Sequence, residues 1–181
     1  SLELKETCAR ILDSGQFILG PEVDQFEAEM ADFLGVKHAI GVSSGTDALI
    51  LALMTLGIGP GDEVICPSFT FFATAGAIWR IGAKPVFVDI NPESFNIEPD
   101  AVARAITPST KALMPVHLFG QMADMQALMD VARAGNIAVI EDAAQAIGSE
   151  TQGQKAGTLG DFGAFSFFPT KNISTGEGGM I

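Results

Sequence analysis

The sequence contains no tyrosine, one tryptophan, two cysteines and two histidines in 181 residues. Cys8 and Cys66 are too few and too widely separated for a disulfide framework or a CxxC metal site, so we expect buried or idle thiols in a reducing compartment. His38 and His117 do not have the spacing of paired metal ligands. We therefore expect neither a metal site nor a disulfide-stabilised secreted fold.

Basic residues and long apolar runs are also scarce. Ten Lys and Arg stand against 22 Asp and Glu, a net charge of -12. No long-range positive field would draw nucleic acid or an anionic membrane, so neither is expected as a partner, and an anionic ligand must be held by local contacts. The longest apolar runs, such as 48–56, are far shorter than the roughly 20 residues that cross a bilayer, and the N-terminus shows no signal-peptide pattern. We expect a cytoplasmic protein.

Strand and helix patterns alternate through the chain. Helices are predicted over 2–12 and from Pro21 to just before Gly35, a strand over 38–42, and a helix that ends near Gly57. The pattern continues with strands 63–66, 85–90, 111–116 and 137–141 and helices 72–81, 99–106 and 122–134. These strands are near-continuous apolar runs, which is typical of a parallel sheet covered by helices on both faces. We predict an α/β fold with three layers, α/β/α, and a mostly parallel central sheet, in which ligands bind beyond the carboxyl ends of the strands.

A single lysine, Lys171, lies in the glycine- and phenylalanine-rich stretch 163–172, and no acidic residue follows it before Glu177. An ammonium group in apolar surroundings loses hydration, which favours the neutral amine that attacks a carbonyl. A solvated lysine in a surface loop explains the same residues. The partners elsewhere in the chain must decide between these interpretations.

Two further segments carry candidate site residues beyond strand ends. Asp142 could pair with a cationic ring nitrogen or cap a following helix, and Glu141 should point to the other side of the strand. Ser44 and Thr46 lie at a turn from strand to helix, where backbone N–H groups and hydroxyls suit a phosphate. An ordinary helix N-cap explains that turn equally simply, and on this segment alone we favour it.

Ordered motifs recur along the whole chain: GQFILGP (15–21), SSGTDA (43–48), GDEV (61–64), PSFTF (67–71), PVHLFG (115–120), EDAAQ (141–145), SFFPTK (166–171) and GEGG (176–179). In these motifs the chain resembles the DegT/DnrJ/EryC1/StrS family of sugar aminotransferases, which depend on pyridoxal 5'-phosphate. The resemblance implies the large domain of a fold type I enzyme of the aspartate aminotransferase superfamily.

The resemblance also implies roles for single residues. Lys171 would attach the cofactor covalently and then move the proton between the substrate and the cofactor, and Asp142 would hold the ring nitrogen in its protonated form. Gln145 would contact the phenolic oxygen side, and Phe71 would stack on the ring. The phosphate would be held by Gly45, Thr46 and Ser166, and Asp47 is counted among the cofactor-binding residues.

The implied reaction moves an amino group from glutamate to a nucleotide-linked keto-sugar, which makes an amino sugar for polysaccharide or glycan biosynthesis. Lys171 favours transamination, because relatives that act as dehydratases have histidine at this position. His117 could face the sugar or be satisfied by backbone groups at a strand end, and we expect the second. The alternatives are a dehydratase, a lyase or another aminotransferase of the same fold, and a non-catalytic regulatory homologue that binds the cofactor. A plain nucleotide-binding module is the weakest alternative, because no dinucleotide fingerprint is present.

Members of the family are longer than this chain and carry a C-terminal small domain. We therefore expect residues 1–20 to form an N-terminal helix and loop and residues 21–181 to form the cofactor-binding large domain, with the small domain absent from this chain. The resemblance further implies a homodimer in which the neighbouring subunit completes each active site. The chain alone is then expected to lack part of its site.

Overall fold

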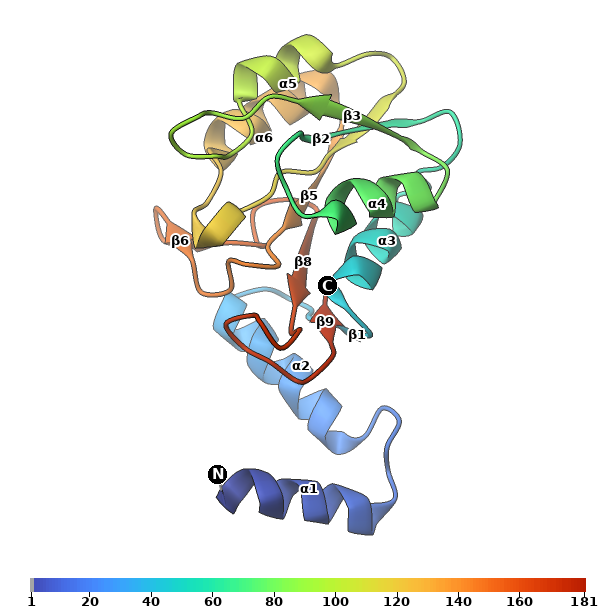
Figure 1. The fold of residues 1–181 in the computed structure, drawn as a ribbon, viewed down its shortest axis with the longest axis vertical. Coiled ribbons are helices and arrows are strands. Elements are labelled where there is room, and N and C mark those ends of the chain that lie inside the picture. The colour runs from blue at the N-terminus through green and yellow to red at the C-terminus, as the bar shows by residue number, and fades with distance from the viewer. Residues whose placement is uncertain (1) are drawn as a thin grey trace. The chain divides into compact units, whose positions relative to one another are not determined.

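A computed structural model describes residues 2–181 and divides the chain into two units, Ser1–Ala39 and Ile40–Ile181 (Figure 1). The first unit consists of two helices, α1 (Leu2–Ser14) and α2 (Pro21–Leu34). Pro21 occupies the first turn of α2, where its missing N–H costs nothing. Gly35 ends the helix in the left-handed conformation, with φ 73°, and its N–H donates to Ala31 and Asp32. Both helices predicted in this part of the sequence are confirmed.

The second unit is built on a seven-stranded sheet with the order β1-β9-β8-β5-β4-β2-β3. Neighbouring strands are parallel from β8 to β3, whereas β9 runs antiparallel to both β8 and β1. A separate two-stranded hairpin, β6 (Glu150–Thr151) with β7 (Gln154–Lys155), lies outside this sheet. The seven strands are β1 (Gly41–Val42), β2 (Glu63–Pro67), β3 (Lys84–Val88), β4 (Thr110–Leu113), β5 (Ala138–Asp142), β8 (Phe162–Ser166) and β9 (Gly179–Met180).

The side chains of the inner strands alternate between two cores. In β2, Val64 and Cys66 pack with helices α3 (Gly45–Thr55) and α4 (Phe72–Arg80), whereas Ile65 packs with α5 (Pro99–Ala105) and α6 (Met125–Gly135). In β5, Ile140 belongs to the first core and Val139 to the second. Successive side chains of a strand point to opposite faces, so helices cover both faces of the sheet (Figure 1). The predicted three-layer α/β/α fold with a mostly parallel sheet is confirmed.

The boundaries of several elements differ from the prediction. The strand predicted over 111–116 ends at Leu113, two residues before Pro115, which cannot donate to a sheet ladder. The helix predicted from residue 122 begins at Met125, because the side chain of Asp124 accepts a hydrogen bond from the N–H of Ala127 and caps it there. β8 and β9 were not predicted, since glycines interrupt both segments.

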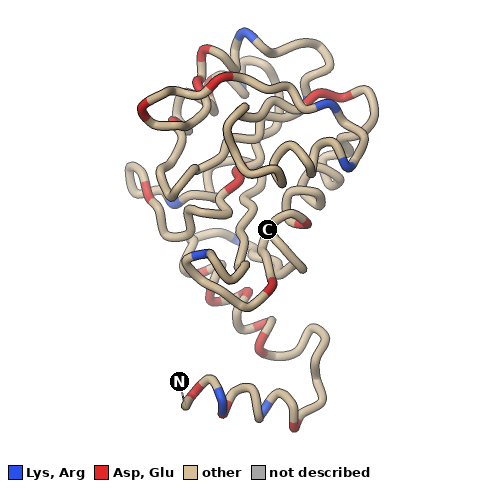
Figure 2. The backbone as a smooth tube through the Cα atoms, in the orientation of Figure 1, with Lys and Arg blue, Asp and Glu red and all other residues tan. Residues whose placement is uncertain are grey.

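Charge is spread over the chain without a basic cluster. Figure 2 shows Asp and Glu distributed along the whole tube and few Lys and Arg between them. Within residues 2–181, no helix has the length and apolar character required to cross a membrane.

Candidate functional site

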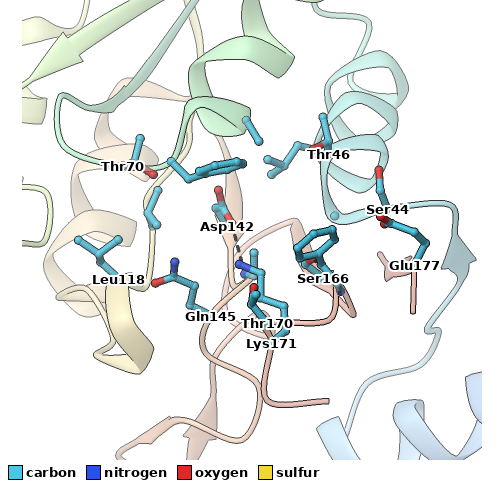
Figure 3. Close-up of a pocket in the computed structure, with 17 residues that line it drawn as sticks. Ser44, Thr46, Thr70, Leu118, Asp142, Gln145, Ser166, Thr170, Lys171 and Glu177 are labelled. Carbon is cyan, nitrogen blue, oxygen red and sulfur yellow. Dashed lines mark hydrogen bonds between the residues drawn. The ribbon is translucent and has the colours of Figure 1, made fainter. Parts of the chain in front are cut away.

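A pocket of about 440 Å³ opens where the segments following β1, β2, β4, β5 and β8 come together (Figure 3). This is the edge of a parallel sheet at which ligands bind. Figure 3 shows Asp142 and Lys171 between Thr70 and Leu118 on one side and Ser44 and Thr46 on the other. Seven of the eight residues that sequence reasoning assigned to the site line the pocket: Gly45, Thr46, Phe71, Asp142, Gln145, Ser166 and Lys171.

Asp142 is the last residue of β5, and its side chain is buried at the base of the pocket. One carboxylate oxygen, Oδ2, accepts a hydrogen bond from the Thr74 hydroxyl at 2.8 Å, and Oδ1 accepts one from the N–H of Ala144 at 3.2 Å. Burial raises the pKa of Asp142, while these two hydrogen bonds and the neighbouring His117 and Lys171 oppose the rise. The chain after Asp142 continues to β6 without a helix, so the interpretation of Asp142 as a helix N-cap is wrong.

Lys171 lies in the loop that follows β8, where its backbone N–H donates to the carbonyl of Phe168 at 2.9 Å. The side chain is half-buried and lines the pocket. The fold brings Asp142 and Glu177 into the same pocket as Lys171, whereas along the chain the next acid after this lysine is Glu177 itself. Lys171 therefore lines the same pocket as a buried carboxylate, so it is not a solvated lysine remote from other polar groups.

The start of α3 forms another wall of the pocket. Ser44 caps this helix, since its hydroxyl accepts a hydrogen bond from the N–H of Asp47 at 3.1 Å. Gly45 and Thr46 are the first two residues of the helix and line the pocket together with Ser166. The predicted N-cap is confirmed, and the same helix end faces the cavity, where the positive end of the helix dipole favours an anion.

Gly45 packs tightly against β8. A Cβ atom at this position would lie 2.7 Å from Cβ of Ser166 and 3.2 Å from the carbonyl oxygen of Phe165. Asp47 does not line the pocket, and its carboxylate instead accepts hydrogen bonds from the hydroxyls of Ser43 and Ser44. Asp47 therefore supports the turn that presents Gly45.

Phe71 and Gln145 complete the predicted set. Phe71 immediately precedes α4, and its side chain is exposed toward the pocket. The side-chain oxygen of Gln145 accepts a hydrogen bond from the N–H of Phe119 at 2.8 Å, which leaves its NH₂ group as the end that can donate to a ligand.

Two buried residues beside the site, Glu141 and His117, were not assigned to it by sequence reasoning. Glu141 points to the opposite side of β5 from Asp142, as predicted. His117 contacts Glu141 through Nε2 at 2.8 Å, and its Nδ1 accepts a hydrogen bond from the N–H of Ala123 at 3.1 Å. An Nδ1 that accepts carries no hydrogen, so the ring donates to Glu141 through Nε2. His117 does not line the pocket, and the expectation that it is satisfied within the protein is confirmed, with a carboxylate as one of its partners.

Backbone N–H groups from the loop before β8 complete the shell of Glu141. Its Oε2 accepts from Gly157 at 2.9 Å, and its Oε1 accepts from Leu159 at 2.6 Å and from Gly160 at 2.7 Å. In the sequence, the only pointers to this arrangement are the consecutive acids Glu141 and Asp142 and the glycine-rich segment 157–163 that follows them. Glu141 thus joins β5, which carries Asp142, to the loop that leads into β8.

The groups in the pocket fit pyridoxal phosphate. The amine of Lys171 suits its aldehyde, the buried carboxylate of Asp142 suits its ring nitrogen, and the start of α3 with Ser166 suits its phosphate. Phe71 offers an aromatic face to the ring. Among the described residues, no group of three or more His, Cys, Asp or Glu side chains is placed to hold a metal ion.

Comparison with known proteins agrees with this chemistry. The sequence profile of the DegT/DnrJ/EryC1/StrS aminotransferase family matches residues 2–181. A pleiotropic regulatory protein of Geobacillus stearothermophilus is 54% identical over 99% of this chain and 50% of its own length. A UDP-N-acetyl-3-dehydro-alpha-D-glucosamine 3-aminotransferase of Acidithiobacillus ferrooxidans is 51% identical over 99% of this chain and 49% of its own length.

Solved structures match equally well. The crystal structure of S. venezuelae DesV in complex with a ketimine intermediate has a TM-score of 0.96 and 48% identity, over 99% of this chain and 48% of that one. NtdA of Bacillus subtilis with bound cofactor PMP has a TM-score of 0.91 and 43% identity, over 97% of this chain and 40% of that one. The chain spans about half the length of the curated relatives it matches.

Proposed function

The chain belongs to the DegT/DnrJ/EryC1/StrS aminotransferase family, and from this membership we propose that it forms the cofactor-binding part of a pyridoxal-phosphate-dependent sugar aminotransferase. The enzyme transfers an amino group from glutamate to a nucleotide-linked keto-sugar. The observation that carries the proposal is that Lys171 and Asp142, which are 29 positions apart in the sequence, line one pocket with the start of α3.

Pyridoxal phosphate, when bound, supplies an aldehyde that takes up the amino group and a ring that withdraws electrons from the reacting carbon. Lys171 would hold the cofactor at this aldehyde through Nζ, and the same amine would hold and move the proton of the reacting carbon. Asp142 lies where a negative charge keeps the ring nitrogen protonated. Its burial strengthens that interaction, because a low local dielectric screens charges less than water does.

The remaining predicted residues bind and orient. Gly45, Thr46 and Ser166 hold the phosphate at the start of α3, and Phe71 stacks on the ring. Gln145, oriented by the N–H of Phe119, donates to the phenolic oxygen side. Asp47 contributes indirectly, because its carboxylate binds the hydroxyls of Ser43 and Ser44 and so supports the turn that carries Gly45.

The substrate class rests on the relatives. One relative is named for a UDP-linked 3-dehydro-glucosamine, another for GDP-perosamine synthesis and another for a dTDP-linked amino sugar. We infer that this chain also acts on a nucleotide sugar, in the cytoplasm, with residues 1–20 as an N-terminal arm and residues 21–181 as the large domain. Lys171 is the basic residue that lines this pocket, whereas the phosphate and carboxylate groups of the ligands need further cations. A second subunit of a homodimer supplies these cations and completes the site.

A second candidate function is regulation without catalysis. The relative named as a pleiotropic regulatory protein, at 54% identity, favours it. Such a protein binds pyridoxal phosphate at the same lysine but releases no 2-oxoglutarate from glutamate.

One experiment separates these outcomes. The complete protein that carries this chain is mixed with pyridoxal phosphate, reduced with borohydride, digested and mapped by mass spectrometry, while a parallel sample is assayed for 2-oxoglutarate with glutamate as donor. Label on Lys171 with 2-oxoglutarate release supports the aminotransferase, and label without release supports the regulator. Absence of label on Lys171, or label on an exposed lysine such as Lys111, would overturn both.

A further inference from the structure

Two threonine hydroxyls connect the pocket with the buried carboxylate of Asp142. Thr70 lines the pocket, and its Oγ1 lies 2.9 Å from Oγ1 of Thr74. Thr74 is completely buried, and its hydroxyl donates to Oδ2 of Asp142 at 2.8 Å. Thr70 belongs to the PSFTF motif, but neither threonine was assigned to the site from the sequence.

The direction of these hydrogen bonds follows from the number of hydrogens. A hydroxyl has one hydrogen and two acceptor positions. Since the hydrogen of Thr74 goes to Asp142, its oxygen must accept from Thr70. Both hydroxyls therefore point their hydrogens toward the carboxylate, and each bond polarises the next.

We propose that Thr74, oriented by Thr70, is a positioning residue that fixes the rotamer of Asp142 and keeps its carboxylate ionised for the ring nitrogen of the cofactor. The inference rests on the proposed function, because Asp142 has this task only if pyridoxal phosphate binds here. Thr74 touches neither the reacting atoms nor the cofactor in this role, and it acts through Asp142.

The surroundings of Asp142 show why such a residue is needed. Burial raises the pKa of this carboxyl, and the hydrogen bond from Thr74 is the largest of the effects that lower it again. The other titratable groups near Asp142 are His117, which is held by Glu141 and by the N–H of Ala123, and Lys171, and both lower the pKa of Asp142 less than Thr74 does. The charge of Lys171 is the smallest of the effects that lower this pKa, so it does not replace the hydrogen bond from Thr74.

The position of Thr74 in the fold also suits the role. It is the third residue of α4, so the positive end of the helix dipole lies on the side of Asp142. Phe71 directly precedes α4, and the N–H of Thr74 donates to its carbonyl at 3.2 Å. One short segment therefore carries the aromatic ring that would stack on the cofactor and the hydroxyl that orients Asp142.

The test compares Thr74→Val, which keeps the shape and removes the hydroxyl, with Thr74→Ser, which keeps the hydroxyl. In the cofactor-free complete protein, the infrared band of a protonated carboxyl, assigned by its loss in Asp142→Asn, is followed as a function of pH. Thr74→Val is expected to move the midpoint of protonation of Asp142 to higher pH, and Thr74→Ser should keep it near the wild-type value. An unchanged midpoint in Thr74→Val would overturn the inference whether or not the cofactor binds.

A second readout uses the cofactor itself. Thr74→Val should weaken the binding of pyridoxal phosphate and slow the half-reaction with glutamate by about tenfold or more, the usual effect of losing a hydrogen bond to a charged group, with the KM for glutamate unchanged. Thr70→Val should have a smaller effect and add little to Thr74→Val, since both act through one chain of hydrogen bonds. Fully additive effects would contradict the shared orientation. If wild-type protein is not labelled on Lys171, the proposed function fails, and the infrared result still decides the role of Thr74.

Discussion

Glu141 and Asp142 are consecutive residues, yet their carboxylates lie on opposite sides of β5 and share none of their described side-chain hydrogen-bond partners. Asp142 faces the pocket and Thr74, whereas Glu141 faces His117 and the loop before β8. Because successive side chains of a strand point to opposite faces, Asp142 lies in the pocket while Glu141 holds β5 to the loop before β8.

Lys171→Ala should remove both the borohydride-trapped cofactor and the amino transfer. Turnover should fall at least about a hundredfold, the lower end of what a positioned acid or base contributes. Circular dichroism should be unchanged, because the side chain is half-buried in a loop. Lys111→Ala, at an exposed position of β4, is the control and should keep full activity. A Lys171→Ala protein that still turns over would exclude this lysine as the catalytic group.

Glu141→Gln should destabilise the fold by about 3 kcal/mol in urea unfolding. Each oxygen of Glu141 accepts two hydrogen bonds, so an amide NH₂ group in place of either oxygen would face two donors. Glu150→Gln, at an exposed position of β6, should change the free energy of unfolding by less than about 0.5 kcal/mol. Equal effects of the two substitutions would show that the buried carboxylate is not needed.

Asp142→Asn should stabilise the cofactor-free protein increasingly as pH rises. Burial raises the pKa of Asp142 above its ordinary value of 3.8, so between the two values the folded state binds more protons than the unfolded state. The free energy of unfolding of the wild type then falls with rising pH through this window, and the asparagine variant lacks that contribution. Urea unfolding of both proteins from acidic to neutral pH gives the difference between their free energies of unfolding. The contributions of all other carboxyl groups are the same in both proteins and cancel in this difference. A difference that does not change with pH would refute this prediction.

Gly45→Ala should weaken cofactor binding and destabilise the fold by about 1–3 kcal/mol, although alanine is normally the better helix residue. The added Cβ would lie 2.7 Å from Cβ of Ser166, so α3 and β8 must move apart at the pocket wall. Gly59→Ala is the matched control, because the nearest atom to its Cβ, the carbonyl oxygen of Ile81, is 3.9 Å away. Calorimetric titration with pyridoxal phosphate and thermal unfolding test both variants. If Gly45→Ala and Gly59→Ala had similar affinities for the cofactor and similar stabilities, α3 and β8 would have to move apart at little cost.

One of the two thiols should react in the native protein. Cys8 is exposed on α1, whereas Cys66 is buried in β2, where burial raises its pKa to about 12. Ellman's reagent should therefore titrate one thiol in buffer and two in guanidinium chloride, since the thiolate is the reacting species. Rapid reaction of both thiols in buffer would show that the sheet opens at β2.

The fold was largely predictable because its signals are local. The apolar runs at β2 and β5 and the helix-ending Gly35 act over a few residues, and these elements lie where the sequence indicated. β9 was missed because its two residues form a strand only by pairing with β8 and with β1, and β1 lies more than 130 positions earlier in the chain.

The candidate site was predictable in part. The motifs and the resemblance led to the residues that line the pocket, but the surroundings of Lys171 depend on how the strands are ordered. No local pattern brings residue 142 next to residue 171, and it was the resemblance that placed both residues at one site. Thr74 was missed because 68 positions separate it from Asp142 and a threonine in a helix carries no signal of its own.

The pairing of β1 with β9 has a mechanical consequence. Ile40 and Ile181 exchange two backbone hydrogen bonds, of 2.8 and 3.0 Å, so two residues that are 141 positions apart meet at one point on the sheet edge. A tensile force applied at these two residues would peel the antiparallel strands apart from one end. The hydrogen bonds would then break one after another, unlike in a pair loaded in shear, where they resist together. We expect this edge to open first when the chain is pulled, whatever the equilibrium stability of the inner strands.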